Sequence, residues 1–432
     1  MNIKNIVISN RKSYLEKKRK NIDKWLLVSR KYYVYKYCNE KDLVIAIKKI
    51  IDENDSLKLY GFMKNGTWEE YYKDEIYVEN YYTLINIQKN SNDFSDELLS
   101  NYIDEKKSKF DLSQNSFHVL VFNFKDNSSL YVFLVHHLIV DAYSYSILLK
   151  KFFDKLLLVD EKKDIKKYNL YDYFFNINKY WDDNLNYELS YWDFSSKFNL
   201  APINYNLNNN NELYEKTRKL SFKLSDDKKN IFEILNIKGN FFIDVLLYSI
   251  GQAYRNWFGC DLNIGIVFQG RIGPENRIIN DFIGWLSETS PILINSSNSI
   301  ESETKEIRKQ INRSQIKVRG FNQIFYFHNN KIFEYPDICL NINFYKVNNI
   351  MNVDKVENSN YKNKPLNTYR PFFLSGGLFF ESNAMILSWD YSRLVVSDYE
   401  VLNFLNDTGN YFLENIYFLN IFNKNELYFN LQ

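Results

Sequence analysis

The chain has 432 residues, of which 45% are hydrophobic and 18% aromatic, and its formal net charge at pH 7 is +2. This length exceeds what one hydrophobic core usually serves, so we expect two domains of roughly 150 to 250 residues each. The nearly balanced charge gives no broad field for nucleic acid or for an anionic membrane, which argues against both as partners.

The cysteines and the N-terminus indicate the compartment. Cys38, Cys260 and Cys339 are widely separated and form no CxxC pair, so neither a disulfide framework nor a zinc site is indicated. The basic N-terminal stretch lacks the apolar core and cleavage site of a secretory signal. No apolar run approaches the ~20 residues that span a bilayer. We therefore expect a reduced, cytoplasmic protein without a metal.

Helices and strands can be predicted in chain order in the first half of the sequence. Residues 40–55 have apolar side chains at helical spacing and end in polar breakers, which predicts a helix. Residues 117–124 and 129–137 are aromatic and β-branched runs separated by KDNSS, which predicts a hairpin. Residues 144–157 place their apolar side chains on one face, so a helix follows the hairpin.

The second half continues the alternation. Residues 241–259 read as a helix and residues 262–271 as a strand that ends in a turn. Polar stretches at residues 159–167, 206–213 and 347–367 lack periodicity and read as loops or linkers. Antiparallel hairpins mixed with helices predict an α+β layered fold.

Two adjacent histidines interrupt the apolar run of the hairpin. His136 and His137 fall where the strand ends, and Asp141 and Ser144 fall where the next helix begins. Adjacent strand residues point to opposite faces, so we expect one imidazole to face the interior and the other a site. Imidazole transfers protons near neutral pH, and Asp141 is suited to a salt bridge or to capping the helix. Packing and hydrogen bonding without catalysis is the alternative.

The stretch HHLIVDAYS resembles the HHxxxDGxS signature of the condensation-type domains of nonribosomal peptide synthetases, a branch of the chloramphenicol-acetyltransferase-like superfamily. Ala142 stands where that signature has glycine. Further segments are similar to other family motifs in the same order, and they lie at residues 50–70, 171–194, 268–294 and 385–416. The resemblance therefore covers nearly the whole chain.

This resemblance implies an α+β fold of two acetyltransferase-like lobes that form a V-shaped pseudo-dimer with a central tunnel. The N-terminal lobe would cover residues 1–165, and the C-terminal lobe, with its crossover segments, residues 166–432. It also implies a freestanding, monomeric domain with no cofactor of its own. Its substrates would be carried on the 4′-phosphopantetheine of peptidyl, aryl or aminoacyl carrier proteins that belong to other synthetase subunits.

The resemblance also assigns roles to residues. His137 would be the catalytic residue and His136 a structural one, while Asp141 would orient the loop by pairing with Arg271 or with Lys58. Further tunnel or loop positions are expected at Ala142, Ser144, Trp285, Ser287 and Glu288.

The resemblance leaves three functions open. Condensation, forming an amide or ester, needs one histidine, whereas the related epimerization domains add glutamates beside a GR pair. Val267 and Ile272 occupy those positions, which favours condensation, although Glu275 or Glu288 could substitute. The IGW stretch that contains Trp285 favours epimerization. An inactive platform that docks carrier proteins is the third hypothesis, because several positions depart from the family consensus, namely Asn54, Lys58, Ala142 and Ile272.

Overall fold

The computed structural model describes residues 27–65, 67–73, 75–157, 179–180, 183–192, 216–224, 241–271, 279, 281–327, 336, 338–342, 374–380, 384–391, 393, 396–419 and 427–431. The predicted loops at 159–167, 206–213 and 347–367 lie outside these residues. The chain divides into two compact units. The first comprises Met1–Asp182, Gly273–Leu286 and Val347–Asn363, and the second comprises the remaining segments.

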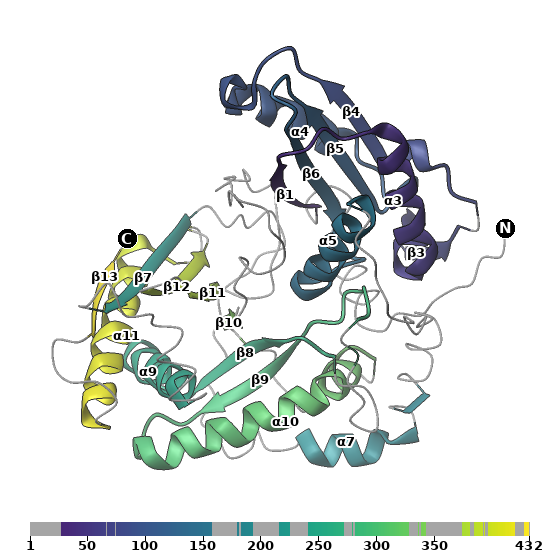
Figure 1. Ribbon diagram of the computed structural model, residues 1–432. Coiled ribbons are helices and arrows are strands. Elements are labelled where there is room, and N and C mark those ends of the chain that lie inside the picture. Colours follow the sequence, from purple (N-terminus) through teal and green to yellow (C-terminus); the bar gives the residue numbers. More distant parts are fainter. Residues whose placement is uncertain are drawn as a thin grey trace. The chain divides into compact units, whose positions relative to one another are not determined.

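The first unit contains a four-stranded sheet in the order β1-β6-β5-β4 and a two-stranded ribbon, β2-β3 (Figure 1). In the four-stranded sheet β4 and β5 are parallel, and the other neighbours are antiparallel. The strands are β1 (Leu27–Val34), β2 (Leu59–Lys64), β3 (Thr67–Tyr72), β4 (Tyr82–Asn86), β5 (Phe117–Asn123) and β6 (Ser129–His136). The helices are α3 (Glu40–Glu53), α4 (Asp96–Lys109) and α5 (Ala142–Leu156), with 3-10 turns η1 (Asp55–Lys58), η2 (Val78–Tyr81) and η3 (Ser91–Asp93).

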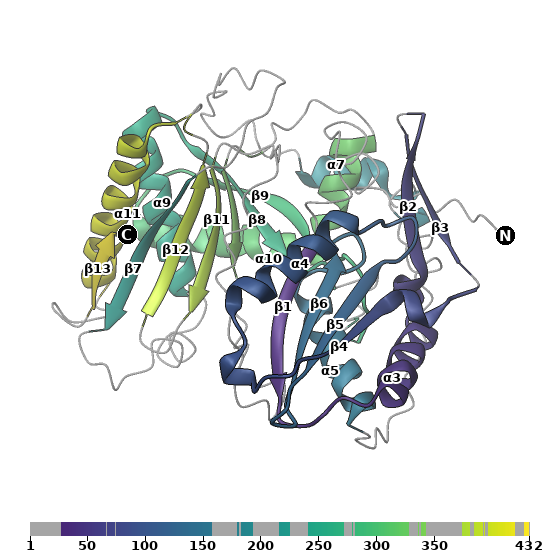
Figure 2. The same ribbon diagram turned by 90° about the horizontal axis from the view of Figure 1, so that it is seen from above.

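Helices cover both faces of the four-stranded sheet. Every residue of β5 and β6 is buried, because side chains alternate between two faces that are each covered by helix. The core on one face includes Val119, Phe133 and Val135 together with residues of α3 and α5. The core on the other face includes Leu120 and Leu134 together with residues of α4 (Figure 2). The chain that follows β6 therefore starts from the end of a rigid, fully buried strand.

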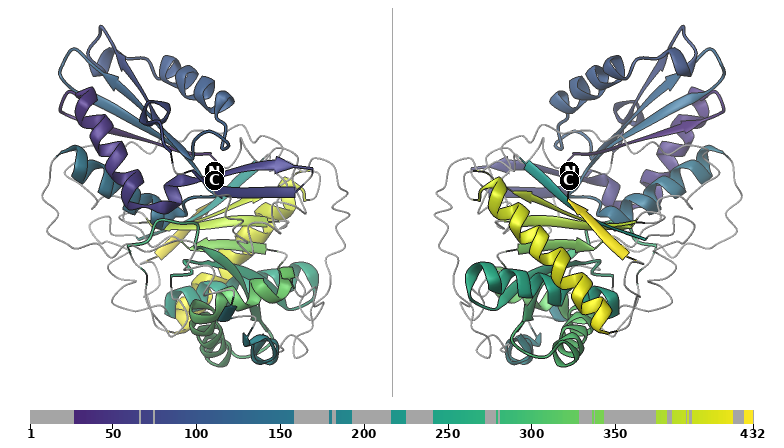
Figure 3. Two further views of the ribbon diagram at one scale, coloured as in Figure 1. Left: turned by 90° about the vertical axis from the view of Figure 1, so that its right-hand side faces the viewer. Right: turned by 90° about the vertical axis from the view of Figure 1, so that its left-hand side faces the viewer.

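The second unit is built on a seven-stranded mixed sheet in the order β13-β7-β12-β11-β10-β8-β9. Its strands are β7 (Lys216–Leu224), β8 (Leu262–Phe268), β9 (Glu288–Ile294), β10 (Ile338–Ile342), β11 (Leu374–Phe380), β12 (Ala384–Tyr391) and β13 (Leu427–Leu431). Its helices are α7 (Leu185–Trp192), α9 (Phe241–Phe258), α10 (Ile300–Phe327) and α11 (Asp398–Phe418). Alternate strand residues pack with α9, α10 and α11 in one core, and Figure 3 shows α11, in yellow, running diagonally across the strands.

Side chains of α10 close the β9 edge of this sheet. The amide of Gln310 accepts from the Leu293 N–H at 2.8 Å and donates to the Leu293 carbonyl at 2.7 Å. The carboxylate of Glu303 accepts from the Asn295 N–H at 2.8 Å. Burial raises the pKa of Glu303, while its hydrogen bonds to Asn298 and Asn295 oppose that rise. Polar side chains thus take the place of a neighbouring strand, which protects an edge that could otherwise pair with another chain.

The structure confirms the mixed α and β architecture and the elements predicted at residues 40–55, 117–137, 144–157, 241–259 and 262–271. The division into units differs from the expected boundary at residue 165. Gly273–Leu286, which follows β8 of the second unit, belongs to the first unit. The described residues Ile279, Phe282, Ile283 and Leu286 are buried in the same apolar core as α3 and α5, and this burial fixes the segment there.

Candidate functional site

The two adjacent histidines have different surroundings. His136 is the last residue of β6 and is fully buried. Its Nδ1 accepts the Leu138 N–H at 3.2 Å, and its ring stacks on Phe110 with centroids 6.2 Å apart. The backbone N–H of His136 donates to the Ser116 carbonyl at 3.1 Å. These contacts make His136 an anchor for the end of the strand.

His137 follows in the turn after β6 and is only half-buried. Its imidazole packs edge-to-face against the indole of Trp285, with ring centroids 4.8 Å apart and an interplanar angle of 64°. The imidazole therefore extends from a fixed strand end, has an aromatic ring on one side and belongs to a half-buried residue whose Nδ1 is shielded from solvent. That combination suits a group that must accept or donate a proton.

Asp141 joins the start of α5 to the segment that carries Trp285. It is the N-cap of α5, where one carboxylate oxygen accepts the Ser144 N–H at 2.7 Å. The other oxygen accepts the Leu286 N–H at 3.0 Å. The side chain is only 4% exposed, so both hydrogen bonds to the carboxylate are shielded from water and strengthened by its charge.

Ser144 holds the residue on the other side of Trp285. Its hydroxyl donates to the Gly284 carbonyl at 2.6 Å and accepts the Gly284 N–H at 3.0 Å. Ser144 is fully buried. The backbone on both sides of Trp285 is therefore hydrogen-bonded to the first turn of α5, which fixes where its indole projects.

The remaining predicted site residues lie at different places. The ammonium of Lys58 lies 3.8 Å from the carboxylate of Asp55 in the same 3-10 turn. Which of Arg271 and Lys58 pairs with Asp141 stays a prediction. Ala142 is the first residue of α5 and is exposed, so its helical backbone does not require the glycine of the signature.

Three other predicted residues belong to the second unit. Arg271 is buried and follows Gly270, whose φ of 60° lies in the left-handed region. Ser287 and Glu288 are half-buried, and Glu288 begins β9 in register with Phe268. Ile272 and Glu275 lie outside the described residues. The structure thus brings together His137, Asp141, Ser144 and Trp285 within the first unit.

One buried lysine near this site was missed by the sequence analysis. Lys151 of α5 is 7% exposed, and its ammonium donates to Asn54 Oδ1 at 3.1 Å and lies 3.5 Å from the Asp281 carbonyl oxygen. Asn54 in turn donates to the Ile50 carbonyl at the end of α3 at 2.7 Å. The signal was a lysine three residues after Leu148 on the buried face of an amphipathic helix.

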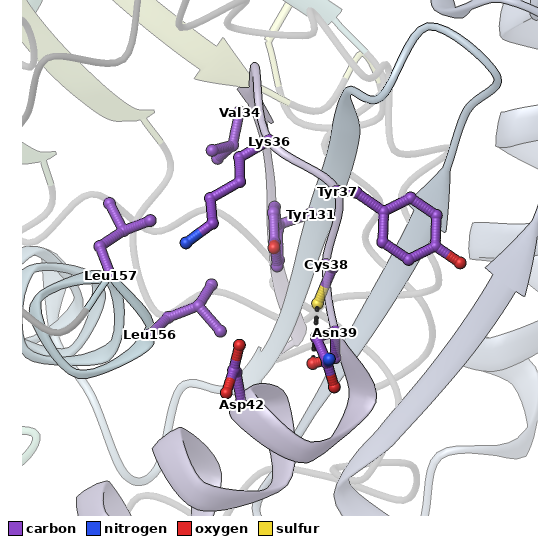
Figure 4. A pocket seen from close by; sticks show the side chains of 9 residues that line it. All are labelled: Val34, Lys36, Tyr37, Cys38, Asn39, Asp42, Tyr131, Leu156 and Leu157. Carbon is purple, nitrogen blue, oxygen red and sulfur yellow. Dashed lines mark hydrogen bonds between the residues drawn. The ribbon is translucent and has the colours of Figure 1, made fainter.

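A small recess lies at the other end of β6 (Figure 4). It is lined by residues that include Lys36, Cys38, Asp42 and Tyr131. Tyr131 precedes His137 by six residues, so along the strand the two are roughly 20 Å apart. Burial raises the pKa of the Cys38 thiol. The thiol is therefore protonated at neutral pH and gives the recess no nucleophile.

Two features are absent from the part of the chain that the structure describes. None of its helices is both long enough and apolar enough to cross a membrane. No three histidine, cysteine, aspartate or glutamate side chains there gather into a group that could hold a metal ion.

Comparisons with known proteins place this geometry in a family. The condensation-domain family matches residues 27–404. Tyrocidine synthase 2 of Brevibacillus parabrevis is 22% identical over 292 residues, which is 64% of this chain but only 8% of that protein. The chain therefore spans a small part of the length of this relative.

Two solved structures share the fold. The epimerization domain from the third module of tyrocidine synthetase B has a TM-score of 0.72 at 18% identity, covering 92% of this chain and 94% of that one. The X-domain from teicoplanin biosynthesis, in a complex with OxyB, has a TM-score of 0.67 at 10% identity, covering 96% of this chain and 94% of that one. The family match spans most of the sequence and includes the histidine pair, Asp141 and Ser144. The chain belongs to the condensation-domain family.

Proposed function

We propose that the chain catalyses condensation between a carrier-bound acyl or peptidyl thioester and an amine or hydroxyl nucleophile. The new C–N or C–O bond forms at the thioester carbonyl, the C–S bond breaks, and the proton lost by the nucleophile ends on the departing thiol. His137 accepts or orients that proton and stabilises the negative charge that develops on the carbonyl oxygen. Imidazole is suited to both tasks near neutral pH.

The position of His137 carries this proposal. Its imidazole is half-buried, extends from the end of a fully buried strand and packs against Trp285 at 4.8 Å. His136, by contrast, is fully buried and its Nδ1 is hydrogen-bonded to the backbone of Leu138. Only the second of the two imidazoles combines a fixed direction with access to a reactant, so the reaction is assigned to His137.

The partners in this proposal are carrier proteins of a nonribosomal peptide synthetase. The phosphopantetheine arms belong to those carriers and would bring the two reactants to His137. Membership of the condensation-domain family supports this part of the proposal. No cofactor of the chain itself is required by the proton transfer.

Epimerization of a carrier-bound residue is the second candidate, and the contact between Trp285 and His137 favours it, because the GW pair is typical of that branch. Exchange of a Cα proton on both faces needs a second acid or base. Val267 in β8 and Ile272 are apolar where that branch has glutamates. Condensation requires no such group and is therefore preferred. A carrier-docking platform without catalysis is the third candidate.

The test combines the chain with acyl-loaded and aminoacyl-loaded carrier proteins in deuterated water and follows the products by mass spectrometry. Condensation predicts a new amide or ester that is lost in His137→Ala and retained in Ser146→Ala. The Ser146 hydroxyl bonds within its own helix to the Ala142 carbonyl at 3.2 Å, so this variant is a matched control on α5.

The other outcomes each decide between the candidates. Deuterium at Cα without a new bond would replace condensation with epimerization. Binding of carriers with neither product would leave the docking platform. An amide that forms equally fast with His137→Ala would remove the role assigned to this imidazole.

A further inference from the structure

Three hydrogen bonds connect the start of α5 to the segment around Trp285. Asp141 accepts the Leu286 N–H at 3.0 Å, and Ser144 bonds to both the N–H and the carbonyl of Gly284, at 3.0 and 2.6 Å. Gly284 and Leu286 are the two chain neighbours of Trp285. Fixing the backbone on both sides of a residue fixes the direction of its Cα–Cβ bond, so Asp141 and Ser144 set the direction in which the Trp285 side chain leaves the backbone.

The indole in turn determines the surroundings of His137. It stands edge-to-face with the imidazole at 4.8 Å, and both side chains are half-buried. Such aromatic contacts depend on ring distance and angle and contribute little to the stability of the fold. A small shift of the Gly284 backbone would therefore move the indole away from the imidazole without unfolding the unit.

We propose that Ser144 is a positioning residue that acts through Trp285 on the imidazole of His137. This inference rests on the proposed function for its effect on catalysis, while its structural part stands on the contacts alone. Ser144 touches neither reactant. It holds Gly284 so that the indole covers one side of the imidazole and restrains the ring in the orientation that faces the substrate.

The measurement uses the chain's small number of histidines. The sequence has four, so the intact protein labelled with carbon-13 in its histidine rings gives one set of ring resonances for each. His137→Gln assigns the His137 resonances by their disappearance. Because an aromatic ring shifts the resonances of protons beside it, Trp285→Leu, which removes the ring, then shows how far the indole displaces those of His137.

The decisive variant is Ser144→Ala, with Ser146→Ala as its matched control on the same helix. We expect the His137 resonances of Ser144→Ala to move towards their position in Trp285→Leu, while those of His118 stay in place. Ser146→Ala should leave all of them unchanged. If Ser144→Ala does not fold, Ser144→Cys keeps the size of the side chain, weakens both bonds to Gly284 and should shift the His137 resonances in the same direction.

A folded Ser144 variant whose His137 resonances coincide with the wild type overturns the inference, even if its thermal stability has fallen. With carriers present, we expect Ser144→Ala to lower kcat at least tenfold with KM changed less than threefold. This kinetic measurement rests on the proposed function, whereas the resonance measurement does not. If His137→Ala leaves product formation intact, the proposed function fails while the resonance shift still decides the positioning role.

Discussion

The two units use the same device for different ends. In the first, Asp141 and Ser144 of α5 bind the backbone of Gly284 and Leu286. In the second, Gln310 of α10 binds the backbone of Leu293. Both helices satisfy main-chain groups of a segment that would otherwise be left without partners.

The two units differ in the side chains carried by the backbone segment to which the helix bonds. Leu293 and its neighbours Ile292 and Ile294 are buried, and the bonds from α10 close the edge of a sheet. Trp285, between the two residues held by α5, is half-buried and packs against His137. We call each set of side-chain bonds from a helix to a backbone segment a clamp: Asp141 and Ser144 to Gly284 and Leu286 in the first unit, and Gln310 to Leu293 in the second. A clamp serves stability alone when the side chains on the held segment point into a core. It serves a site when one of them borders a reactive group.

Removing Asp141 is the strongest test of this comparison. Asp141→Ala loses two bonds to a buried carboxylate, from the Ser144 and Leu286 N–H groups, so we expect the free energy of unfolding to fall by about 4 kcal/mol. Hydrogen exchange at the Leu286 amide should accelerate. Asp281→Ala is the control, because that residue is exposed. Unchanged exchange at Leu286 would contradict the clamp.

The pH dependence of unfolding tests a contribution to the stability of the first unit that does not involve Asp141 or Ser144. His118 is buried in β5, where its Nδ1–H donates to the Asn80 carbonyl at 3.0 Å and its Nε2 accepts the Thr83 hydroxyl at 2.9 Å. Nδ1 is assigned the proton because a carbonyl can only accept. Burial lowers the pKa of His118 to about 4.

In the unfolded chain the pKa of His118 is near its ordinary value of 6.5. Between pH 6.5 and 4 the His118 imidazole is therefore protonated in the unfolded chain but neutral in the folded protein. Stability is therefore complete above pH 6.5, and about 3 kcal/mol is lost by pH 4. Urea unfolding at pH 7, 5.5 and 4 should show this loss in the wild type and a flatter dependence in His118→Gln. Equal pH dependence in both proteins would exclude His118 as the cause.

Removing the bonds between Gln310 and Leu293 in the second unit should lower stability without changing the surroundings of His137. Gln310→Leu removes the two bonds to the Leu293 backbone, and we expect a loss of about 2 kcal/mol because both groups are buried. Hydrogen exchange at Leu293 should accelerate while the His137 ring resonances and product formation stay unchanged. A shift of the His137 resonances in this variant would show that the bonds of Gln310 also influence the site, contrary to the distinction drawn between the two units.

The smallest effect is expected at Lys151. Lys151→Met keeps the length of the side chain but removes the donor to Asn54 Oδ1, so we expect about 1 kcal/mol of destabilisation. Lys150→Met is the matched control on the same helix, since the Lys150 side chain is exposed although its partner Asp154 is buried, and an ion pair that is open to solvent on the lysine side contributes about 0.5 kcal/mol. Differential scanning calorimetry of the two variants ranks them. Equal melting temperatures would show that Lys151 contributes no more than its exposed neighbour.

Much of the fold near the site could be predicted from the sequence. The hairpin of β5 and β6 and the helix α5 follow from local periodicity, and the placement of His136 and His137 at the strand end follows with them. The long helix α10 was not predicted, because its first half is dominated by charged and polar residues. Local pattern was also silent on β1 and on the ribbon β2-β3.

The clamp itself could not be predicted in the same way. The capping role of Asp141 is local, and the sequence predicts it as the alternative to a salt bridge. The bond from Leu286 to its second oxygen and the reciprocal bonds between Ser144 and Gly284 join residues far apart in the sequence. Nothing in the periodicity of residues 279–286 indicates which unit they join, because four apolar residues suit either core.

This separation also bears on how the site is assembled during folding. The contacts of Ser144 with Gly284 and of Asp141 with Leu286 span 140 and 145 residues. Closing a chain loop of that length costs roughly 4 kcal/mol of entropy, and contacts of such high sequence separation form slowly. We therefore expect α5 and the hairpin to be structured before residues 279–286 dock. The imidazole of His137 would acquire its aromatic neighbour only in that late step.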